Sequence, residues 1–217
     1  MRLAPQPPAA LLFDLDGTLL DTERLIIEAE MDAFAAIGRP VTHEFLLQFV
    51  GKDVTACIAI LADAMPDLDQ DALSAAREPA IAEKYAGGIP LKAGVAQMLE
   101  ALPKDVPRAI VTSSEAGSAA LKLRMSPLDG WFDSVITASD VAHRKPAPDP
   151  YLLGADRLGV APEHCIAFED SETGAQAAQA AGCYTVQIPD TVPSTGTHAD
   201  LLSVRIDSAA RKLGLIS

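Results

Sequence analysis

The chain has 217 residues, enough for one large domain or for a core domain with a smaller insert. Its formal net charge of −13 argues against nucleic acid as a partner, because a phosphate backbone is held by clustered Lys and Arg. No apolar run is long enough to span a bilayer, and the three cysteines form no Cys-x-x-Cys pair. We therefore expect a soluble, cytoplasmic protein whose partner is neither a nucleic acid nor a membrane.

The first predicted element is a strand over residues 9–13, an apolar run that ends at Asp14. Similar short runs recur at residues 109–111, 134–136, 165–168 and 184–188. Continuous apolar runs are typical of strands that are buried on both faces of a parallel sheet. Helical patterns lie between most of them, so the sequence predicts an α/β fold, a parallel sheet covered by helices. A last short strand is expected near Val204.

The segment from residue 22 to residue 86 interrupts this alternation. An amphipathic helical pattern runs to Gly38, and a second helix is expected after Asp53. A third helical run covers residues 69–85, where Pro79 should kink or split it. Residues 87–90, Gly-Gly-Ile-Pro, have the composition of a linker. The pattern predicts an all-helical insert after the first strand.

Two carboxylates follow the first predicted strand. Asp14 and Asp16 point to the same side of an extended chain, and Gly17 allows a sharp turn after them. Two carboxylates this close repel each other unless a cation lies between them or one is protonated. The alternative is a polar strand end in which both aspartates make turn-type hydrogen bonds.

A second acidic pair, Glu169 and Asp170, follows the predicted strand at residues 165–168. By itself it is explained as a helix start capped by Asp170 or Ser171. Together with Asp14 and Asp16, however, it would form a pocket of four carboxylates, which is costly to assemble without a divalent cation. Oxygen ligands suit magnesium better than zinc.

Two further elements offer groups that bind phosphate. Thr112 and Ser113 follow the strand at residues 109–111 and supply hydroxyl and N–H donors near a helix start. Lys145 lies in a proline-rich loop, where the simpler interpretation is a solvated side chain.

These residues occur in the order and at the strand ends that are typical of one family. The sequence resembles the haloacid dehalogenase-like superfamily, in the branch with a helical cap inserted after the first strand. Its motifs are matched by residues 14–18, Thr112, Lys145 and the Glu169–Asp170 pair. The resemblance implies a Rossmann-like core at residues 1–21 and 88–217 and a helical cap at residues 22–87.

The resemblance also implies roles for individual residues. Asp14 would be the nucleophile and Asp16 the general acid and base of a phosphoric monoester hydrolase. Mg²⁺ would be bound by Asp14, the backbone carbonyl of Asp16, Asp170 and, directly or through water, Glu169. The phosphate of a small phosphorylated substrate would be held by Thr112, Ser113 and Lys145.

Other members of the superfamily carry out different reactions. Dehalogenases and phosphonate hydrolases lack the second aspartate, so Asp16 argues against both. β-Phosphoglucomutases carry a His where this chain has Ile26, which favours a phosphatase but leaves a mutase open. A non-catalytic module that binds phosphometabolites also stays open.

Substrate choice is expected to come from the cap, through Glu23, Gly51 and Lys52. The resemblance suggests a phosphorylated sugar or polyol as the substrate.

Overall fold

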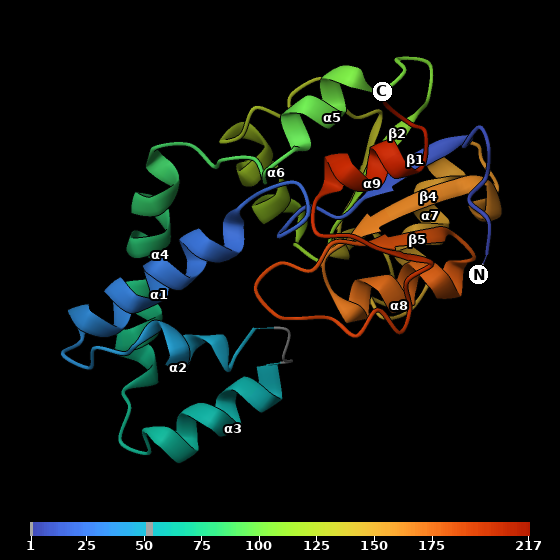
Figure 1. Cartoon of the computed structure of the whole chain (residues 1–217). Coiled ribbons are helices and arrows are strands. Elements are labelled where there is room, and N and C mark those ends of the chain that lie inside the picture. Colours follow the sequence, from blue (N-terminus) through green and yellow to red (C-terminus); the bar gives the residue numbers. More distant parts are fainter. Residues whose placement is uncertain (1, 51–53) are drawn as a thin grey trace. The chain divides into compact units, whose positions relative to one another are not determined.

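The computed structural model describes residues 2–50 and 54–217. The chain divides into two compact units (Figure 1). One comprises Met1–Asp21 with Ile89–Ser217, and the other comprises Thr22–Gly88. The second unit is therefore an insertion between two parts of the first.

The first unit contains a six-stranded parallel sheet. Its strands are β1 (Ala10–Phe13), β2 (Arg108–Val111), β3 (Ser134–Ile136), β4 (Cys165–Glu169), β5 (Tyr184–Gln187) and β6 (Leu201–Leu202). They lie in the order β3-β2-β1-β4-β5-β6, which places β1 and β4 at the centre. The predicted α/β fold is confirmed. The last short strand expected near Val204 is β6, which ends at Leu202 just before that residue; Val204 itself is 88% exposed and lies outside the strand.

Helices cover both faces of this sheet. They are α5 (Val95–Ala101), α6 (Ala116–Arg124), α7 (Asp149–Arg157), α8 (Glu172–Ala181) and α9 (Ile206–Lys212), with short 3₁₀ turns at Ala138–Asp140 and Pro162–His164. Leu12 and Val111 belong to the buried cluster that packs under α7 and α8, whereas α5 and α9 lie on the other side of the sheet (Figure 1). On that other side Phe13 stacks on Phe168, with ring centroids 4.9 Å apart. Each such fully buried side chain contributes about 1.5–3 kcal/mol to stability, so the strands are held firmly.

The register of the central strands determines which loops meet. Phe13 of β1 is level with Ile110 of β2 and with Phe168 of β4. The N–H of Asp14 donates to the Phe168 carbonyl at 2.9 Å, so the pairing continues past the end of β1. The segments that follow β1, β2 and β4 therefore lie side by side at the carboxyl edge of the sheet, where ligands bind in open parallel sheets.

The second unit, Thr22–Gly88, is entirely helical in its described part. It contains α1 (Thr22–Ala36), α2 (His43–Leu47), α3 (Val54–Ala64) and α4 (Gln70–Ala86). Its own core includes Phe34, Leu46, Leu61 and Leu73. The three helices that the sequence predicts are present. The five-residue α2, capped by the Thr42 side chain, was not predicted because it is too short to show a period.

The sequence predicts a kink or a split at Pro79; helix α4 runs unbroken through this residue, so it is not split. A proline inside a helix removes one hydrogen bond and crowds the preceding turn. Ion pairs to α1 hold α4 on both sides of this position, from Arg77 to Glu30 at 2.8 Å and from Lys84 to Asp32 at 2.6 Å. Packing between the helices thus outweighs the local preference to break.

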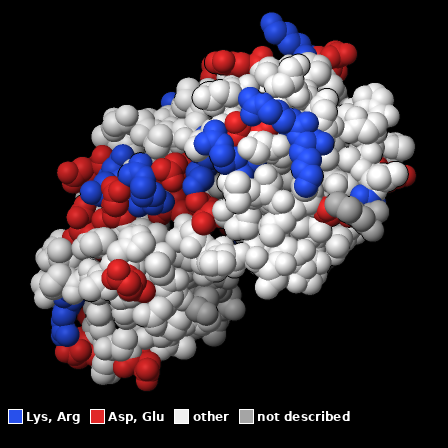
Figure 2. All heavy atoms as spheres, in the orientation of Figure 1, with Lys and Arg blue, Asp and Glu red and all other residues white. Residues whose placement is uncertain are grey.

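Within residues 2–50 and 54–217, no helix is both long and apolar enough to cross a membrane. On the face shown in Figure 2, acidic side chains lie beside the basic ones in both units. Around α9, for example, Arg205 and Arg211 each lie 2.9 Å from a carboxylate oxygen of Asp207. These basic side chains are therefore partly neutralised within their own unit.

Candidate active site

A buried lysine joins two of the predicted carboxylates at the carboxyl edge of the sheet. The Lys145 ammonium donates to Asp14 Oδ1 at 2.7 Å, to Glu169 Oε1 at 2.5 Å and to the Val111 carbonyl at 2.8 Å. Its side chain is only 3% exposed, so the interpretation as a solvated lysine is wrong. All three protons of the ammonium thus have acceptors from β1, β2 and β4.

Burial changes the proton affinity of these groups. Desolvation raises the pKa of Asp14 to about 8, even though Lys145 acts in the opposite direction, and the neighbouring Glu169 adds to the rise. Burial also lowers the pKa of Lys145, but the carboxylates of Asp14 and Glu169 outweigh it and the net pKa is raised. Lys145 therefore stays charged, while Asp14 needs a further cation nearby to be fully ionised at neutral pH.

Glu169 is completely buried and has both carboxylate oxygens engaged. The Tyr151 hydroxyl donates to Oε1 at 2.6 Å, beside Lys145, and the Ser171 hydroxyl donates to Oε2 at 3.2 Å. The Lys145 ammonium also lies 5.0 Å from the centre of the Tyr151 ring, within the range of a cation–π contact. Burial, the largest cause, raises the pKa of Tyr151 well above its ordinary value, so this hydroxyl keeps its proton.

Sequence reasoning did not find Tyr151. Tyr151 lies on α7, a few residues after Lys145. This closeness in sequence to Lys145 is the one local feature that could have indicated a role at the site.

Three carboxylates approach closely enough to share one cation. Asp14, Glu169 and Asp170 each bring an oxygen within 4.8 Å of the others. Together with the Lys145 ammonium, these three carboxylates have a formal charge of −2, which a divalent ion would balance. The all-oxygen donor set suits Mg²⁺. Because Glu169 already uses both oxygens, Asp14 and Asp170 are the better placed ligands.

Two glycines make room for these carboxylates. A Cβ on Gly17, whose φ is +81°, would lie 2.5 Å from Asp170 Oδ2. A Cβ on Gly174 would lie 2.0 Å from the Glu169 carboxyl carbon. The Ser171 side chain caps α8 by accepting a hydrogen bond from the Gly174 N–H, so the predicted helix cap is Ser171. Asp170 does not cap the helix, and its carboxylate lies with those of Asp14 and Glu169.

Asp16 has a different environment. Its carboxylate is not part of the acidic group found among the described residues. Instead, Oδ1 accepts from Lys122 at 2.6 Å and Oδ2 accepts from the Ser114 hydroxyl at 2.9 Å. Lys122 was not predicted, because nothing in the local sequence shows that a lysine on α6 reaches back to β1.

The loop after β2 carries Thr112 and Ser113. Thr112 is 2% exposed, and its hydroxyl accepts from the Ser114 N–H at 3.0 Å, which closes a tight turn. Ser113 is exposed at the tip of this turn. The structure therefore brings Thr112 to the same edge of the sheet as Asp14, since β2 lies beside β1.

The three residues expected to select the substrate belong to the helical segment. Glu23 lies in the first turn of α1. Gly51 and Lys52 lie outside the described residues.

Comparisons with known proteins identify the family of the chain. The chain matches the haloacid dehalogenase-like hydrolases over residues 11–188. It is 34% identical to fructose-1-phosphate phosphatase YqaB of Escherichia coli K12, over 83% of this chain and 96% of that protein. It is 33% identical to a phosphorylated carbohydrates phosphatase of Thermotoga maritima, over 80% of this chain and 81% of that protein.

Among solved structures, a haloacid dehalogenase family hydrolase from Deinococcus radiodurans R1, crystallised with phosphate and sodium, superimposes with a TM-score of 0.83. It is 29% identical and the match covers 97% of this chain and 98% of that one. The protein therefore belongs to the haloacid dehalogenase-like hydrolase family. The family and the hydrolase class predicted from the sequence are confirmed.

Proposed function

We propose that the protein is a magnesium-dependent phosphatase that hydrolyses a sugar or polyol phosphate through an aspartyl-phosphate intermediate. The observation that carries this proposal is the buried Lys145, which bridges Asp14 and Glu169 at the carboxyl edge of the sheet. Such an ion pair network is expensive to bury, and a nucleophile that must meet an anionic phosphate is one reason to retain it.

The proposed metal ligands are the carboxylates of Asp14 and Asp170 and the backbone carbonyl of Asp16. Glu169 would act through water or through Lys145, because its own oxygens accept from Lys145, Tyr151 and Ser171. When bound, Mg²⁺ lowers the pKa of the Asp14 carboxyl and offsets charge on the phosphoryl oxygens.

In the first step a carboxylate oxygen of Asp14 attacks phosphorus while the bond from phosphorus to the ester oxygen breaks. Asp16, in its protonated form, gives its proton to the departing oxygen, which leaves as an alcohol. Asp14 is now the mixed anhydride and Asp16 is ionised.

In the second step Asp16 takes a proton from a water molecule, whose oxygen attacks phosphorus. The bond between phosphorus and Asp14 breaks, inorganic phosphate leaves, and both aspartates return to their starting forms. Positioning and electrostatics provide most of the catalysis in such phosphoryl transfers.

The phosphate is proposed to be held by Lys145 and by the donors of the loop after β2. Thr112 and Ser113 present hydroxyl and N–H groups in a tight turn that is fixed by the hydrogen bond from the Ser114 N–H to Thr112 Oγ1. A ring of donors aimed at the phosphoryl oxygens stabilises the charge that spreads over them during transfer.

The helical unit, Thr22–Gly88, is proposed to act as a cap that selects the substrate, with Glu23, Gly51 and Lys52 as the candidate contacts. The names of the two bacterial phosphatases support a sugar phosphate as the substrate class. The β-phosphoglucomutases that the chain resembles carry a His where this chain has Ile26, a side chain that cannot transfer a proton, and this difference favours a phosphatase.

A phosphate-release assay tests the proposal. The protein is incubated with a panel of sugar, polyol and small-acid phosphates, with Mg²⁺ and with a chelator. The Asp14→Asn variant is compared with Asp105→Asn, the same substitution at an exposed turn residue. We expect Mg²⁺-dependent release that Asp14→Asn abolishes and Asp105→Asn leaves intact.

Chromatographic analysis of the sugar phosphates after incubation, and a binding measurement with the same panel, distinguish the other functions. Conversion of a sugar 1-phosphate into its 6-phosphate without net phosphate release would contradict a phosphatase and indicate a mutase. Binding of phosphate esters with no turnover of any of them would indicate a binding module.

A further inference from the structure

The side chains of Lys122, Asp16 and Ser114 form a triangle of hydrogen bonds in which each contacts the other two. The Lys122 ammonium lies 2.6 Å from Asp16 Oδ1 and 2.9 Å from Ser114 Oγ, and Ser114 Oγ lies 2.9 Å from Asp16 Oδ2. Both carboxylate oxygens thus accept a hydrogen bond from a different side chain. Two donors on two oxygens fix the plane of a carboxylate as well as its position.

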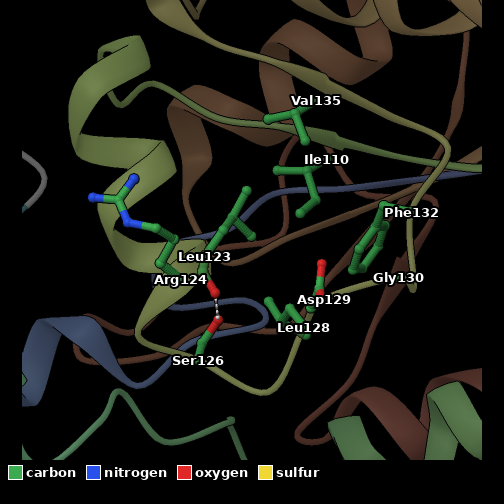
Figure 3. A pocket seen from close by; sticks show the side chains of 9 residues that line it. All are labelled: Ile110, Leu123, Arg124, Ser126, Leu128, Asp129, Gly130, Phe132 and Val135. Carbon is green, nitrogen blue, oxygen red and sulfur yellow. Dashed lines mark hydrogen bonds between the residues drawn. The ribbon is translucent and has the colours of Figure 1, made fainter.

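The helix α6 explains how a distant lysine arrives there. Helical side chains tilt toward the amino end of their helix, so the long Lys122 side chain runs back toward the loop that carries Ser114. Two positions further, Arg124 points to the other side of the helix, because successive residues are separated by about 100°. Arg124 and Leu123 line a separate cavity of about 410 Å³ (Figure 3).

An ordinary surface ion pair, which contributes little to stability, would be the simplest interpretation of the contact. The burial argues against it. The Lys122 side chain is 12% exposed and that of Asp16 is 27% exposed, which is much less than for the pair between Arg24 and Glu28 at 52% and 42%.

We propose that Lys122 is a positioning residue that, together with Ser114, orients the Asp16 carboxyl group toward the oxygen of the leaving group. This inference rests on the proposed function, in which Asp16 transfers protons in both steps. Lys122 acts through Asp16 and does not itself contact the phosphate or the reacting atoms. A misplacement of about 1 Å in a catalytic group can cost about 100-fold in rate, so a group that fixes this carboxylate matters for catalysis.

The dependence on the leaving group separates this role from a structural one. An alkyl alkoxide is a poor leaving group and needs the proton from Asp16, whereas p-nitrophenolate departs without one. For Lys122→Met we expect kcat/KM to fall about 10- to 100-fold with fructose 1-phosphate and less than about threefold with p-nitrophenyl phosphate. If the enzyme does not hydrolyse fructose 1-phosphate, the fastest alkyl phosphate of the panel replaces it.

Three further variants complete the experiment. Lys122→Arg keeps a charged donor and should recover part of the alkyl phosphate activity. Ser114→Ala removes the second donor and should shift the ratio of the two kcat/KM values in the same direction. Arg124→Met makes the matched change of charge and length on the same helix and should leave both activities unchanged. Urea unfolding of each variant shows that it is folded.

Equal losses on both substrates, or no loss on either, would overturn the positioning role. If Asp16→Asn selectively lowers alkyl phosphate turnover but Lys122→Met does not, the inference fails while the proposed function stands. If the wild-type protein releases phosphate from neither class of ester, the proposed function fails and the inference fails with it.

Discussion

The substitution Gly174→Ala on α8 should displace the buried Glu169 carboxylate. A Cβ at this position would lie 2.0 Å from the carboxyl carbon of Glu169 and 2.0 and 2.1 Å from its oxygens, where carbon contacts are ordinarily about 3.5–4.0 Å. The carboxylate cannot step aside without loss, because Lys145, Tyr151 and Ser171 hold it.

The size of the effect follows from three contributions. Overpacking a tight core costs about 1–3 kcal/mol, and losing one hydrogen bond to a buried charged group costs about 1.5–3 kcal/mol. The higher helix propensity of alanine offsets at most about 1 kcal/mol of this loss in unfolding free energy. The net loss of unfolding free energy is therefore about 1.5–5 kcal/mol. Because a displaced Glu169 also removes one of the three acceptors that position the Lys145 ammonium, phosphatase activity should fall at least about tenfold.

Urea unfolding and phosphate release measure the two effects. The matched control is Gly117→Ala on α6, where a Cβ would meet nothing within 4 Å. It should be neutral or stabilising by up to about 1 kcal/mol. A Gly174→Ala protein as stable and as active as the wild type would refute the reasoning.

Three other predictions concern the same unit. Tyr151→Phe removes the hydrogen bond to buried Glu169 and should lower the free energy of unfolding in urea by about 1.5–3 kcal/mol; an unchanged urea midpoint would contradict this. The Thr137 hydroxyl, with the Thr137 N–H and an arginine, holds the pKa of Asp140 at about 2 instead of 3.8, so its contribution is present above pH 3.8 and is lost as the pH falls toward 2. Asp140→Asn should therefore flatten the decline of the thermal midpoint over this interval, and an identical decline would count against the assignment. Mg²⁺ at 100 times its dissociation constant should stabilise the protein by about 2.7 kcal/mol, an effect that Asp170→Asn should reduce and that thermal unfolding with and without chelator measures.

The fold could be predicted largely because its signals are local. The apolar runs before Asp14 and before Glu169 predict buried strands, and these are β1 and β4 of the sheet. The signals failed where the context is tertiary. Pro79 lies in a continuous helix because ion pairs and packing hold α4 on α1.

The candidate site shows the same division. Strand ends followed by acidic residues predict which carboxylates share an edge, and Asp14, Glu169 and Asp170 do lie together. Two side chains that hydrogen-bond to carboxylates of the candidate site come from helices, and no local sequence pattern shows that these helices pack beside the site. Tyr151 reaches Glu169 from α7, and Lys122 reaches Asp16 from α6 across 106 residues of sequence.

The central claim is that Asp14 carries the phosphoryl group during turnover. The most direct measurement is rapid acid quenching of the Mg²⁺-loaded enzyme with a radiolabelled phosphate ester, followed by peptide mapping of the retained label. The account predicts label on the peptide that contains Asp14, formed and lost at rates compatible with turnover and absent from Asp14→Asn. Steady phosphate release by the wild type with no label on that peptide, or undiminished release by Asp14→Asn, would contradict it.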